Sequence, residues 1–311
     1  MLNKLSIDKV YETQDGHQLA IYAKGNPVKP AVICLHGGPG GNILPSSFDV
    51  FDLNEWFVIA FDQRGCGQST PFASLENNTI FHSVEDIEGI RKLYSLDQVT
   101  LSGGSYGTTL ALAYAIKYPE NVSQMVLRGI FLGRDEDTAW LYQEGASYFY
   151  PEVHERFKAN FTSEQKNNLI QSYYHVFKTE SEDVVKQYAK QWADWEGAIV
   201  KLVPEQEMEV EITPTDISIG LLECHYFANH MFFESDNYIL DNSDKYKDIP
   251  TIIVHGRYDV DCRPGGAFEL KQEMTQCKLY FAPTSGHSGS EPEIKQFLTE
   301  SFNNLVFERK L

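Results

Sequence analysis

The residue best placed for covalent chemistry is Ser105, at the centre of the glycine-rich segment GGSYG of residues 103–107. An apolar run at 99–101 precedes this segment, and a helix-like run at 108–115 follows it. A sharp turn between a strand and a helix holds a serine Oγ clear of its own backbone, and glycines remove the side chains that would collide there. The first N–H groups of the helix then face a developing oxyanion. The pattern therefore predicts a nucleophilic serine rather than an ordinary glycine-serine turn.

A serine hydroxyl is a weak nucleophile, so Ser105 needs a base, and the base needs an acid that orients it. Of the nine histidines, His287 lies in a glycine-flanked loop directly after the last predicted strand, which favours it as the base. Asp259 follows the apolar run 251–256 and is the favoured acid, while Asp261, two residues further on, is an open alternative. The order serine, aspartate, histidine along a chain is one of those found in catalytic triads.

Two backbone N–H groups are needed to hold the oxyanion that forms during acyl transfer, one of them from the residue after the nucleophile. Tyr106 supplies that group. The second is expected from Gly38, in the glycine-rich turn of residues 36–40 after the apolar run 31–35. Backbone without side chains can approach a substrate closely. The serine segment, the downstream aspartate and histidine, and this turn together indicate acyl-transfer chemistry.

The elements that must position these residues alternate along the chain. The predicted strands are 6–11, 18–23, 31–35, 57–61, 99–102, 125–127, 251–256 and 278–282. The predicted helices of the same parts of the chain are 81–95, 106–118, 265–273 and 291–306. Apolar strands alternating with amphipathic helices indicate an α/β fold, with a mostly parallel sheet covered by helices on both faces.

The alternation of strands and helices is interrupted in the middle of the chain. Aromatic and charged helical patterns, such as 163–177 and 181–195, replace the strands there. We therefore expect one α/β core made of residues 1–133 and 244–311, with a helical cap inserted at 134–243. An insertion at this point would lie over the C-terminal edge of the sheet, where open α/β folds bind their ligands.

The composition is that of a globular protein, with 42% hydrophobic and 23% charged residues in a chain of 311. No run approaches the roughly 18 apolar residues of a membrane span, and the first residues lack the apolar core of a signal peptide. Five scattered cysteines without a C-x-x-C pair favour free thiols in a reducing compartment. We therefore expect a cytoplasmic protein with no membrane partner. Helical His-x-x-x-His and phosphate-loop patterns are missing, so neither a metal nor another cofactor is expected.

The charge of the chain is strongly negative, −18 at pH 7. Nucleic acid is therefore not expected as a partner, because phosphate binding needs clustered Lys and Arg. The acids are concentrated: residues 134–245 carry 22 Asp and Glu against 9 Lys and Arg. Most of these acids suit a solvated surface, but such a segment also attracts a cationic substrate.

Nine blocks of sequence, spread from one end of the chain to the other, match one family of enzymes. They are HGGPGG (36–41), DQRGCGQS (62–69), GGSYGTTLALAY (103–114), VLRGIF (126–131), QEGAS (143–147), WEG (195–197), ECHYF (223–227), HGRYD (255–259) and GHS (286–288). Through these blocks the chain resembles the prolyl aminopeptidases, also called proline iminopeptidases, of the α/β-hydrolase superfamily. The serine segment alone would indicate only the superfamily, whereas the blocks inside the predicted cap carry the narrower resemblance.

The resemblance implies a serine peptidase that releases an N-terminal residue, preferentially proline, from short peptides through an acyl-enzyme. It implies the same triad of Ser105, Asp259 and His287. It also implies that the N–H groups of Gly38 and Tyr106 form the oxyanion hole.

Two further glutamates gain a role only from the resemblance, which implies that Glu196 and Glu223 bind the free amino end of the substrate. The nitrogen of an N-terminal proline is protonated at neutral pH, and a pair of carboxylates in an aromatic setting would hold that cation. Without the resemblance, either glutamate would be interpreted as a surface residue of a helix paired with a lysine.

An apolar pocket for the proline ring is expected from residues of both core and cap, namely Phe131, Trp140, Phe227 and Cys262. The chain departs from the family at Tyr106, where tryptophan is frequent, and at Gln68, where arginine is usual. It also has Leu141 where an aromatic residue is common, which bears on the fit to a proline ring.

Two alternatives remain open from the sequence. The first is a related amino-acid amidase or esterase, or an aminopeptidase of broader specificity, on the same scaffold. The second is a catalytically silent member that serves as a binding module. Silent members usually lose a residue of the triad, and this chain keeps all three candidates.

Overall fold

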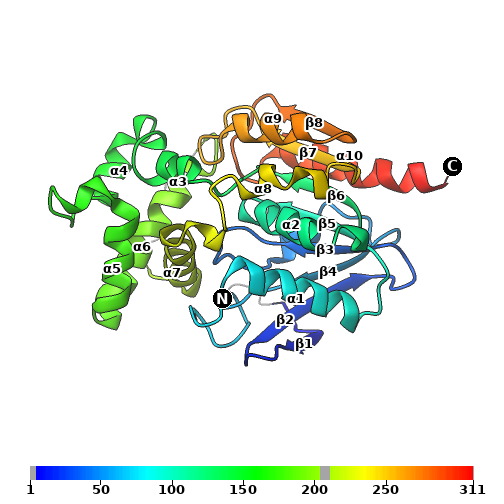
Figure 1. Cartoon of the computed structure of the whole chain (residues 1–311), viewed down its shortest axis with the longest axis horizontal. Coiled ribbons are helices and arrows are strands. Elements are labelled where there is room, and N and C mark those ends of the chain that lie inside the picture. Colours follow the sequence, from blue (N-terminus) through cyan, green and yellow to red (C-terminus); the bar gives the residue numbers. More distant parts are fainter. Residues whose placement is uncertain (1–4, 204–210, 311) are drawn as a thin grey trace.

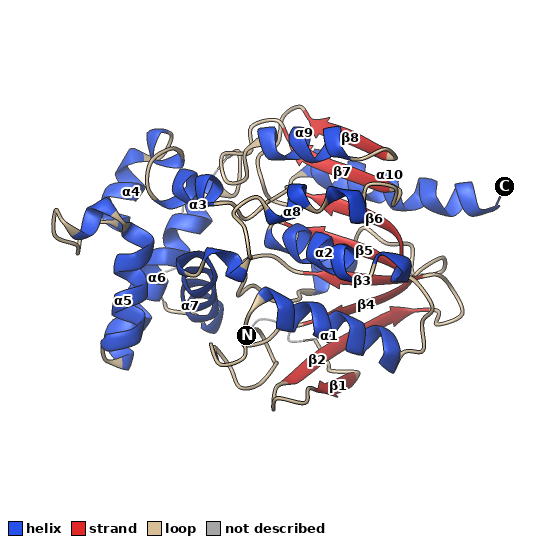
Figure 2. Ribbon diagram, viewed as in Figure 1, coloured by secondary structure: helices blue, strands red, loops and turns tan. Residues whose placement is uncertain are grey.

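The computed structural model describes residues 5–203 and 211–310. Within them eight strands form one sheet in the order β1-β2-β4-β3-β5-β6-β7-β8 (Figures 1 and 2). The strands are β1 (Lys9–Glu12), β2 (Gln18–Gly25), β3 (Ala31–Leu35), β4 (Phe57–Phe61), β5 (Val99–Gly104), β6 (Val122–Arg128), β7 (Thr251–Gly256) and β8 (Cys277–Ala282). The β1–β2 and β2–β4 pairs are antiparallel, and the pairs from β4 through to β8 are parallel. The predicted α/β class with a mostly parallel sheet is confirmed.

Helices cover both faces of the sheet. The first face carries α1 (Ile80–Leu93), α2 (Tyr106–Lys117), α8 (Tyr238–Asp241) and α9 (Pro264–Glu273), and the second carries α10 (Pro292–Lys310). Successive side chains of a strand point to opposite faces. Ile33 of β3 accordingly joins the core under α1 and α2, and its neighbour Val32 joins the core that includes Phe302 of α10. A strand buried on both sides is apolar throughout, which is why β3 and β4 were visible as continuous apolar runs.

Most of the predicted core elements lie close to the observed ones. The strands predicted at 31–35, 57–61 and 251–256 match β3, β4 and β7 to the residue. β1 begins three residues later than predicted, and β6 begins at Val122, three residues earlier. Both strands have polar residues at these ends, which makes apolar periodicity a poor guide to their limits.

Five further helices form a second layer beyond one end of the sheet (Figure 1). They are α3 (Asp135–Tyr142), α4 (Pro151–Phe157), α5 (Leu169–Thr179), α6 (Glu182–Ile199) and α7 (Pro214–Ala228). The helix expected at 163–177 begins only at Leu169, because the side chain of Asn168 accepts a hydrogen bond from the N–H of Gln171 and starts the helix there.

The second layer meets the core at the loop that follows β3. Ser218 of α7 donates its hydroxyl to the carbonyl oxygen of Gly40 at 2.6 Å. A Cβ on Gly40 would lie 2.4 Å from the carbonyl oxygen of Ser218, so only glycine lets the helix approach this loop. The layer therefore lies over the carboxyl ends of the parallel strands.

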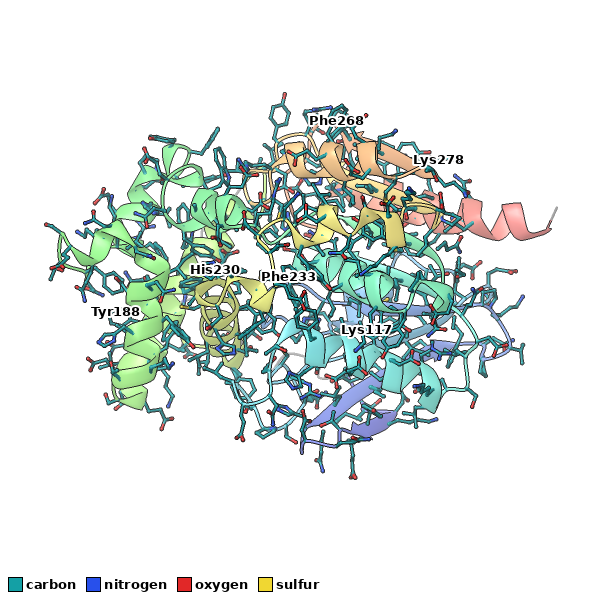
Figure 3. The ribbon with its side chains drawn as sticks, viewed as in Figure 1. Lys117, Tyr188, His230, Phe233, Phe268 and Lys278 are labelled. Atoms are coloured by element: carbon teal, nitrogen blue, oxygen red, sulfur yellow. The ribbon has the colours of Figure 1, made fainter. Side chains whose placement is uncertain are left out.

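The chain returns from the second layer to the core through an aromatic cluster of Phe81, Phe233 and Tyr238. The rings of Phe233 and Tyr238 stack with their centroids 4.6 Å apart, and both meet Phe81 of α1 edge-on. Figure 3 shows Phe233 where α7 and the core helices come together. Of the helices in the described residues, none has the length and apolarity that crossing a membrane requires.

Candidate active site

Ser105 lies at the turn between β5 and α2, with φ 58° and ψ −132°. A non-glycine residue at positive φ is strained, and this strain is typical of a serine presented at the apex of such a turn. The flanking glycines explain how the turn closes. A Cβ on Gly103 would lie 2.3 Å from the carbonyl oxygen of Gly107, and one on Gly107 would lie 2.3 Å from that of Leu35. The segment therefore needs glycine at both positions.

The predicted base and acid are in direct contact. His287 Nδ1 lies 2.7 Å from Asp259 Oδ2, and both side chains are buried. Asp259 Oδ1 accepts a second hydrogen bond, from the N–H of Cys262 at 2.8 Å. Burial raises the pKa of Asp259 and lowers that of His287. A neutral imidazole that donates Nδ1–H to Asp259 keeps the lone pair of Nε2 free to accept a proton.

The alternative acid, Asp261, occupies a different place. Its Oδ2 lies 3.8 Å from Nε2 of His287, on the opposite side of the ring from Asp259. A carboxylate there cannot hold the Nδ1–H, so the orienting contact belongs to Asp259. The structure records no hydrogen bond between Ser105 and His287 within the residues it describes, and such bonds are often long before a substrate binds.

Two residues of β6 and its C-terminal turn, to which the sequence pattern assigned no role, hold His287. Arg128 donates from Nη1 to the carbonyl oxygen of His287 at 2.8 Å, and its own carbonyl oxygen accepts the N–H of Ser105 at 3.0 Å. Gly129 has φ +60°, and a Cβ there would lie 2.7 Å from Cε1 of His287. Both lie in the block VLRGIF, which the sequence singled out only through the family resemblance.

The glycine-rich turn after β3 lies against the serine. A Cβ on Gly37 would be 3.0 Å from Cβ of Ser105, and Gly38 has φ +111°, a conformation that favours glycine. The N–H groups of Gly38 and Tyr106 donate to no residue in the described part of the chain. Both N–H groups are thus free to donate to an oxyanion; their role as the oxyanion hole stays a prediction.

Contacts from the block DQRGCGQS hold this turn in place. The N–H of Gln63 donates to Nε2 of His36 at 3.0 Å, and the side-chain amide of Gln63 donates to the carbonyl oxygen of His36 at 2.9 Å. Gln68, the departure noted in this block, donates to the hydroxyl of Tyr22 at 2.8 Å, away from the serine.

A small cavity of about 220 Å³, a volume that includes space open to solvent, lies beside the serine. Its walls come from the core and from the second layer of helices: Gly38, Ser105, Phe131, Leu141, Tyr142, Glu196, Glu223, Phe227, Asp261 and Cys262. Three of the four residues expected around a proline ring are among them. The fourth, Trp140, does not line the cavity, because its indole N–H turns away to donate to the carbonyl oxygen of Val260 at 2.7 Å.

The carboxyl groups of Glu196 in α6 and Glu223 in α7 both contact the hydroxyl of Tyr142. The hydroxyl of Tyr142 lies 2.5 Å from Glu196 Oε1 and 3.1 Å from Glu223 Oε2. Trp192 also donates its indole N–H to Glu223 Oε2, at 2.6 Å. The remaining oxygen of each glutamate has no hydrogen-bond partner within the described residues. Burial raises the pKa of both carboxyls, that of Glu223 to about 8. The charge of Asp261 raises both pKa values further, and the charge of Glu223 adds to the rise for Glu196.

The close approach of α6 and α7 brings these two glutamates together. A Cβ on Gly220 would lie 2.7 Å from Cα of Ala189, so small residues at both positions let the helices touch. Tyr142 and the carboxylates then face the serine from the layer above. The sequence offered no local signal for Tyr142, because it follows Trp140 and Leu141 at the end of a short helix and only packing decides which of these side chains faces inward.

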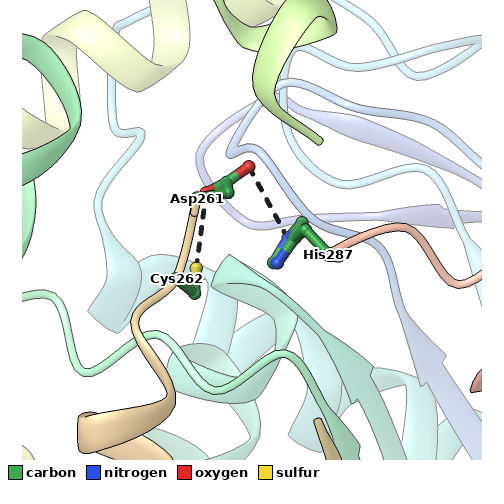
Figure 4. A group of neighbouring side chains, drawn as sticks. All are labelled: Asp261, Cys262 and His287. Carbon is green, nitrogen blue, oxygen red and sulfur yellow. Dashed lines mark hydrogen bonds and ion pairs between the residues drawn. The ribbon is translucent and has the colours of Figure 1, made fainter. Parts of the chain in front are cut away.

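One group of side chains could also ligate a metal ion. Asp261, Cys262 and His287 place one donor atom each within 4.8 Å of one another, and Figure 4 shows Asp261 between the other two. Such a mixed carboxylate, thiolate and imidazole set suits Zn²⁺. An ion there would take the Nε2 lone pair that His287 would need as the predicted base, so the predicted triad chemistry and metal binding would compete for the same atom.

Comparison with known proteins agrees with this geometry. Residues 30–293 match the model of a family described as alpha/beta hydrolase fold. A proline iminopeptidase of Neisseria gonorrhoeae is 38% identical over 291 residues, which cover 93% of this chain and 93% of that protein. A proline iminopeptidase of Arabidopsis thaliana is 39% identical over 287 residues, 91% of this chain and 75% of that one. An esterase from Exiguobacterium antarcticum shares the fold, with a TM-score of 0.61, 20% identity, and coverage of 96% of this chain and 98% of that structure.

Proposed function

The chain belongs to the proline iminopeptidase family of α/β-hydrolase-fold enzymes, and we propose that Ser105, His287 and Asp259 are the triad with which it releases N-terminal proline from peptides. Ser105 Oγ attacks the carbonyl carbon of the N-terminal residue while its proton passes to Nε2 of His287. Asp259 keeps the proton of Nδ1 in place and stabilises the imidazolium that forms. The 2.7 Å contact between Asp259 and His287 supports these roles.

The negative charge of the tetrahedral intermediate is held by the N–H groups of Gly38 and Tyr106. His287 then gives its proton to the departing amine, and the shortened peptide leaves. Water attacks the acyl-enzyme on Ser105, with His287 again accepting a proton, and free proline is released. In this mechanism the protein groups that act on the carbonyl carbon and its oxygen come from five residues, namely Ser105, His287, Asp259, Gly38 and Tyr106.

An aminopeptidase differs from other serine peptidases in that it recognises the free amino end of its substrate. We assign it to Glu196 and Glu223. Tyr142 occupies one oxygen of each, which leaves one oxygen of each glutamate for the substrate. The protonated nitrogen of an N-terminal proline has two N–H bonds, and two carboxylate oxygens match that number. An acylated nitrogen has neither the charge nor the hydrogens.

The ring of the proline would rest against Phe131, Phe227 and Cys262, which are the apolar walls of the cavity. The centroids of the two phenylalanine rings lie 5.7 Å apart. We propose that residues 134–243, of which 204–210 lie outside the described residues, act as the cap that closes this cavity, so that short peptides with a free N-terminus are preferred to folded proteins. All five cysteines are free thiols, which supports a cytoplasmic location.

The observation that carries the assignment is that two carboxylates, from α6 and α7, open into the same cavity as Ser105. It is tested by hydrolysis of prolyl-p-nitroanilide and of its N-acetyl derivative, with wild-type protein and Ser105→Ala. We expect cleavage of the free amine alone, abolished in the variant. Equal cleavage of both compounds would keep Ser105 but remove the amino-end assignment, and would favour an amidase or esterase. Cleavage of neither would favour a binding module.

A further inference from the structure

A third carboxyl group opens into the cavity beside the serine. Asp261 lies in the turn after β7, is 5% exposed, and lines the same cavity as Ser105 and the two glutamates. Its presence is unexpected for a site that binds proline, because two carboxylates already match the two N–H bonds of that substrate. It also carries a cost, since a buried carboxylate loses its hydration.

Asp261 lacks a strong hydrogen-bond donor. Its Oδ1 accepts only from the thiol of Cys262, at 3.5 Å, and a thiol is a weak donor. Its Oδ2 lies 3.8 Å from Nε2 of His287, beyond hydrogen-bond distance (Figure 4). Within the described residues no backbone or side-chain N–H or O–H donates to this carboxylate. A buried carboxylate without a strong hydrogen-bond donor is suited to bind a cationic ligand whose N–H groups can donate to it.

The substrate's amino nitrogen can reach this carboxylate. That nitrogen is about 2.5 Å from the carbonyl carbon under attack, because only Cα separates them. Ser105 attacks that carbon and passes its proton to Nε2 of His287, so the nitrogen must lie within a few ångströms of Nε2. Asp261 Oδ2 is adjacent to the same atom.

The number of N–H bonds on the substrate's amino nitrogen indicates a role for the third carboxylate, Asp261. A protonated N-terminal proline offers two, which the free oxygens of Glu196 and Glu223 accept. A protonated primary amine offers three. We propose that Asp261 accepts the third N–H of a primary ammonium group and so extends the substrates of this enzyme to peptides that begin with small residues such as alanine. This inference rests on the proposed function of the same site.

Another role for Asp261 makes a different prediction. A carboxylate near Nε2 could instead stabilise the imidazolium of His287. That cation forms with every substrate, so its loss would slow all of them equally. Binding of a third N–H affects only substrates that have one. The two roles are therefore separated by comparing amines rather than by measuring the activity on one substrate.

The test uses three p-nitroanilides, of proline, alanine and N-methylalanine, with wild-type protein and Asp261→Asn. N-Methylalanine has two N–H bonds when protonated but no ring, so it separates the number of hydrogens from ring shape. We expect Asp261→Asn to lower kcat/KM for the alanyl compound about 10- to 100-fold, the usual size of a lost hydrogen bond to a charged group. The prolyl and N-methylalanyl compounds should change less than about 3-fold.

A matched control removes a carboxylate of the second layer that is exposed to solvent. Glu155 is 69% exposed at its side chain and pairs with Lys158. Glu155→Gln should leave the ratio of alanyl to prolyl hydrolysis as in the wild type. Activity on the prolyl compound also reports whether Asp261→Asn folds.

A binding measurement removes catalysis from the comparison. In Ser105→Ala, with and without Asp261→Asn, the Kd of alaninamide and of prolinamide can be measured by calorimetry. We expect Asp261→Asn to weaken alaninamide about 10-fold or more and to leave prolinamide within about 3-fold.

Three outcomes would overturn the inference: an equal loss on all three anilides, an unchanged rate on the alanyl compound, or a loss on N-methylalanine as large as that on alanine. Failure of the proposed function is distinct from these. It would appear as no hydrolysis of any of the three compounds by wild-type protein, or as hydrolysis that survives Ser105→Ala.

Discussion

Nε2 of His255 lies 3.3 Å from Oδ2 of Asp259, the same oxygen that is 2.7 Å from His287. His255 is fully buried in β7, and its Nδ1 accepts the N–H of Ile130 at 3.1 Å. The hydrogen of this ring is therefore assigned to Nε2, which donates to the carbonyl oxygen of Cys262 at 2.8 Å. Asp259 thus lies between two imidazoles, and His255 lowers the pKa that burial has raised.

We predict from this contact that His255→Phe moves the acid limb of the kcat/KM profile to higher pH. Without the nearby N–H, the pKa of Asp259 rises further. At a given acid pH, more of the carboxyl is then protonated and unable to orient His287. We expect a shift of about one pH unit and a loss in kcat of about 10-fold at neutral pH. The pH profile of prolyl-p-nitroanilide hydrolysis checks this. If His255→Phe lowers the melting temperature but leaves the acid limb of the kcat/KM profile at the same pH, then His255 contributes packing and does not affect the pKa of Asp259.

Tyr142 is predicted to matter for binding rather than for chemistry. Its hydroxyl bridges Glu196 and Glu223, which repel each other when both are ionised. Tyr142→Phe removes the bridge but keeps the ring that packs on Trp192, 4.2 Å away between centroids. We expect KM for prolyl-p-nitroanilide to rise about 10-fold, with kcat changed less than about 3-fold. Steady-state kinetics at pH 7.5 would decide, and a fall in kcat at constant KM would contradict the assignment.

The buried acid Glu223 is predicted to cost stability at alkaline pH. Its pKa in the unfolded chain is near the ordinary 4.5, but in the folded protein it is raised to about 8. Between these values the folded protein binds a proton that the unfolded chain has lost. The stabilisation is therefore complete below about pH 4.5 and disappears as the pH rises through about 8.

The neutral variant Glu223→Gln should not show this pH dependence. We expect its melting temperature to exceed that of the wild type by about 3 °C at pH 8 and by less at pH 5, while its hydrolysis of free amines is weaker. Thermal unfolding at the two pH values measures the difference. Glu155→Gln serves as the exposed control, and the same offset at both pH values for Glu223→Gln would refute the linkage.

Cys262 is predicted to make the enzyme sensitive to thiol reagents, without taking part in catalysis. Its side chain lines the cavity, and burial raises the pKa of the thiol well above its ordinary value. Alkylation by iodoacetamide should therefore be slow and should accelerate with pH, because the thiolate is the reactive form. It should abolish hydrolysis by filling the cavity. Cys262→Ser should retain activity and resist the reagent, and inactivation of that variant at the wild-type rate would locate the reactive thiol elsewhere, for example at the partly exposed Cys277.

Asp259 and Asp261 illustrate how far the sequence could predict the site. Both follow the same strand, and spacing alone left either as the acid. In the folded turn, the N–H of Cys262 holds Asp259 toward His287 Nδ1, while Asp261 is turned to the other side of the ring. A turn of four residues can point neighbouring side chains in opposite directions, and the hydrogen bonds that select one arrangement involve residues from distant strands.

Trp140 illustrates the same limit in a helix. Sequence placed it in the proline pocket, but Leu141 and Tyr142 line the cavity instead. Consecutive residues of a helix are about 100° apart around its axis. Which one faces inward depends on how α3 rotates against α6 and α7, and α3, with eight residues, is too short to reveal that rotation by its periodicity.

The sequence by itself determined the mostly parallel α/β sheet, the serine turn between β5 and α2, and the order along the chain of the three residues proposed as the triad. These features depend on local rules: strand apolarity, glycines that permit a close turn, and loops at the carboxyl ends of strands. Only the tertiary structure decided which residues converge on Ser105 from the second layer and from the turn after β7. Glu196 and Glu223 gained a role from the sequence only through the family resemblance, and Asp261 gained none at the amino end. The reason is that the convergence of these three residues depends on packing between segments far apart in the chain, which strand and helix periodicity does not record.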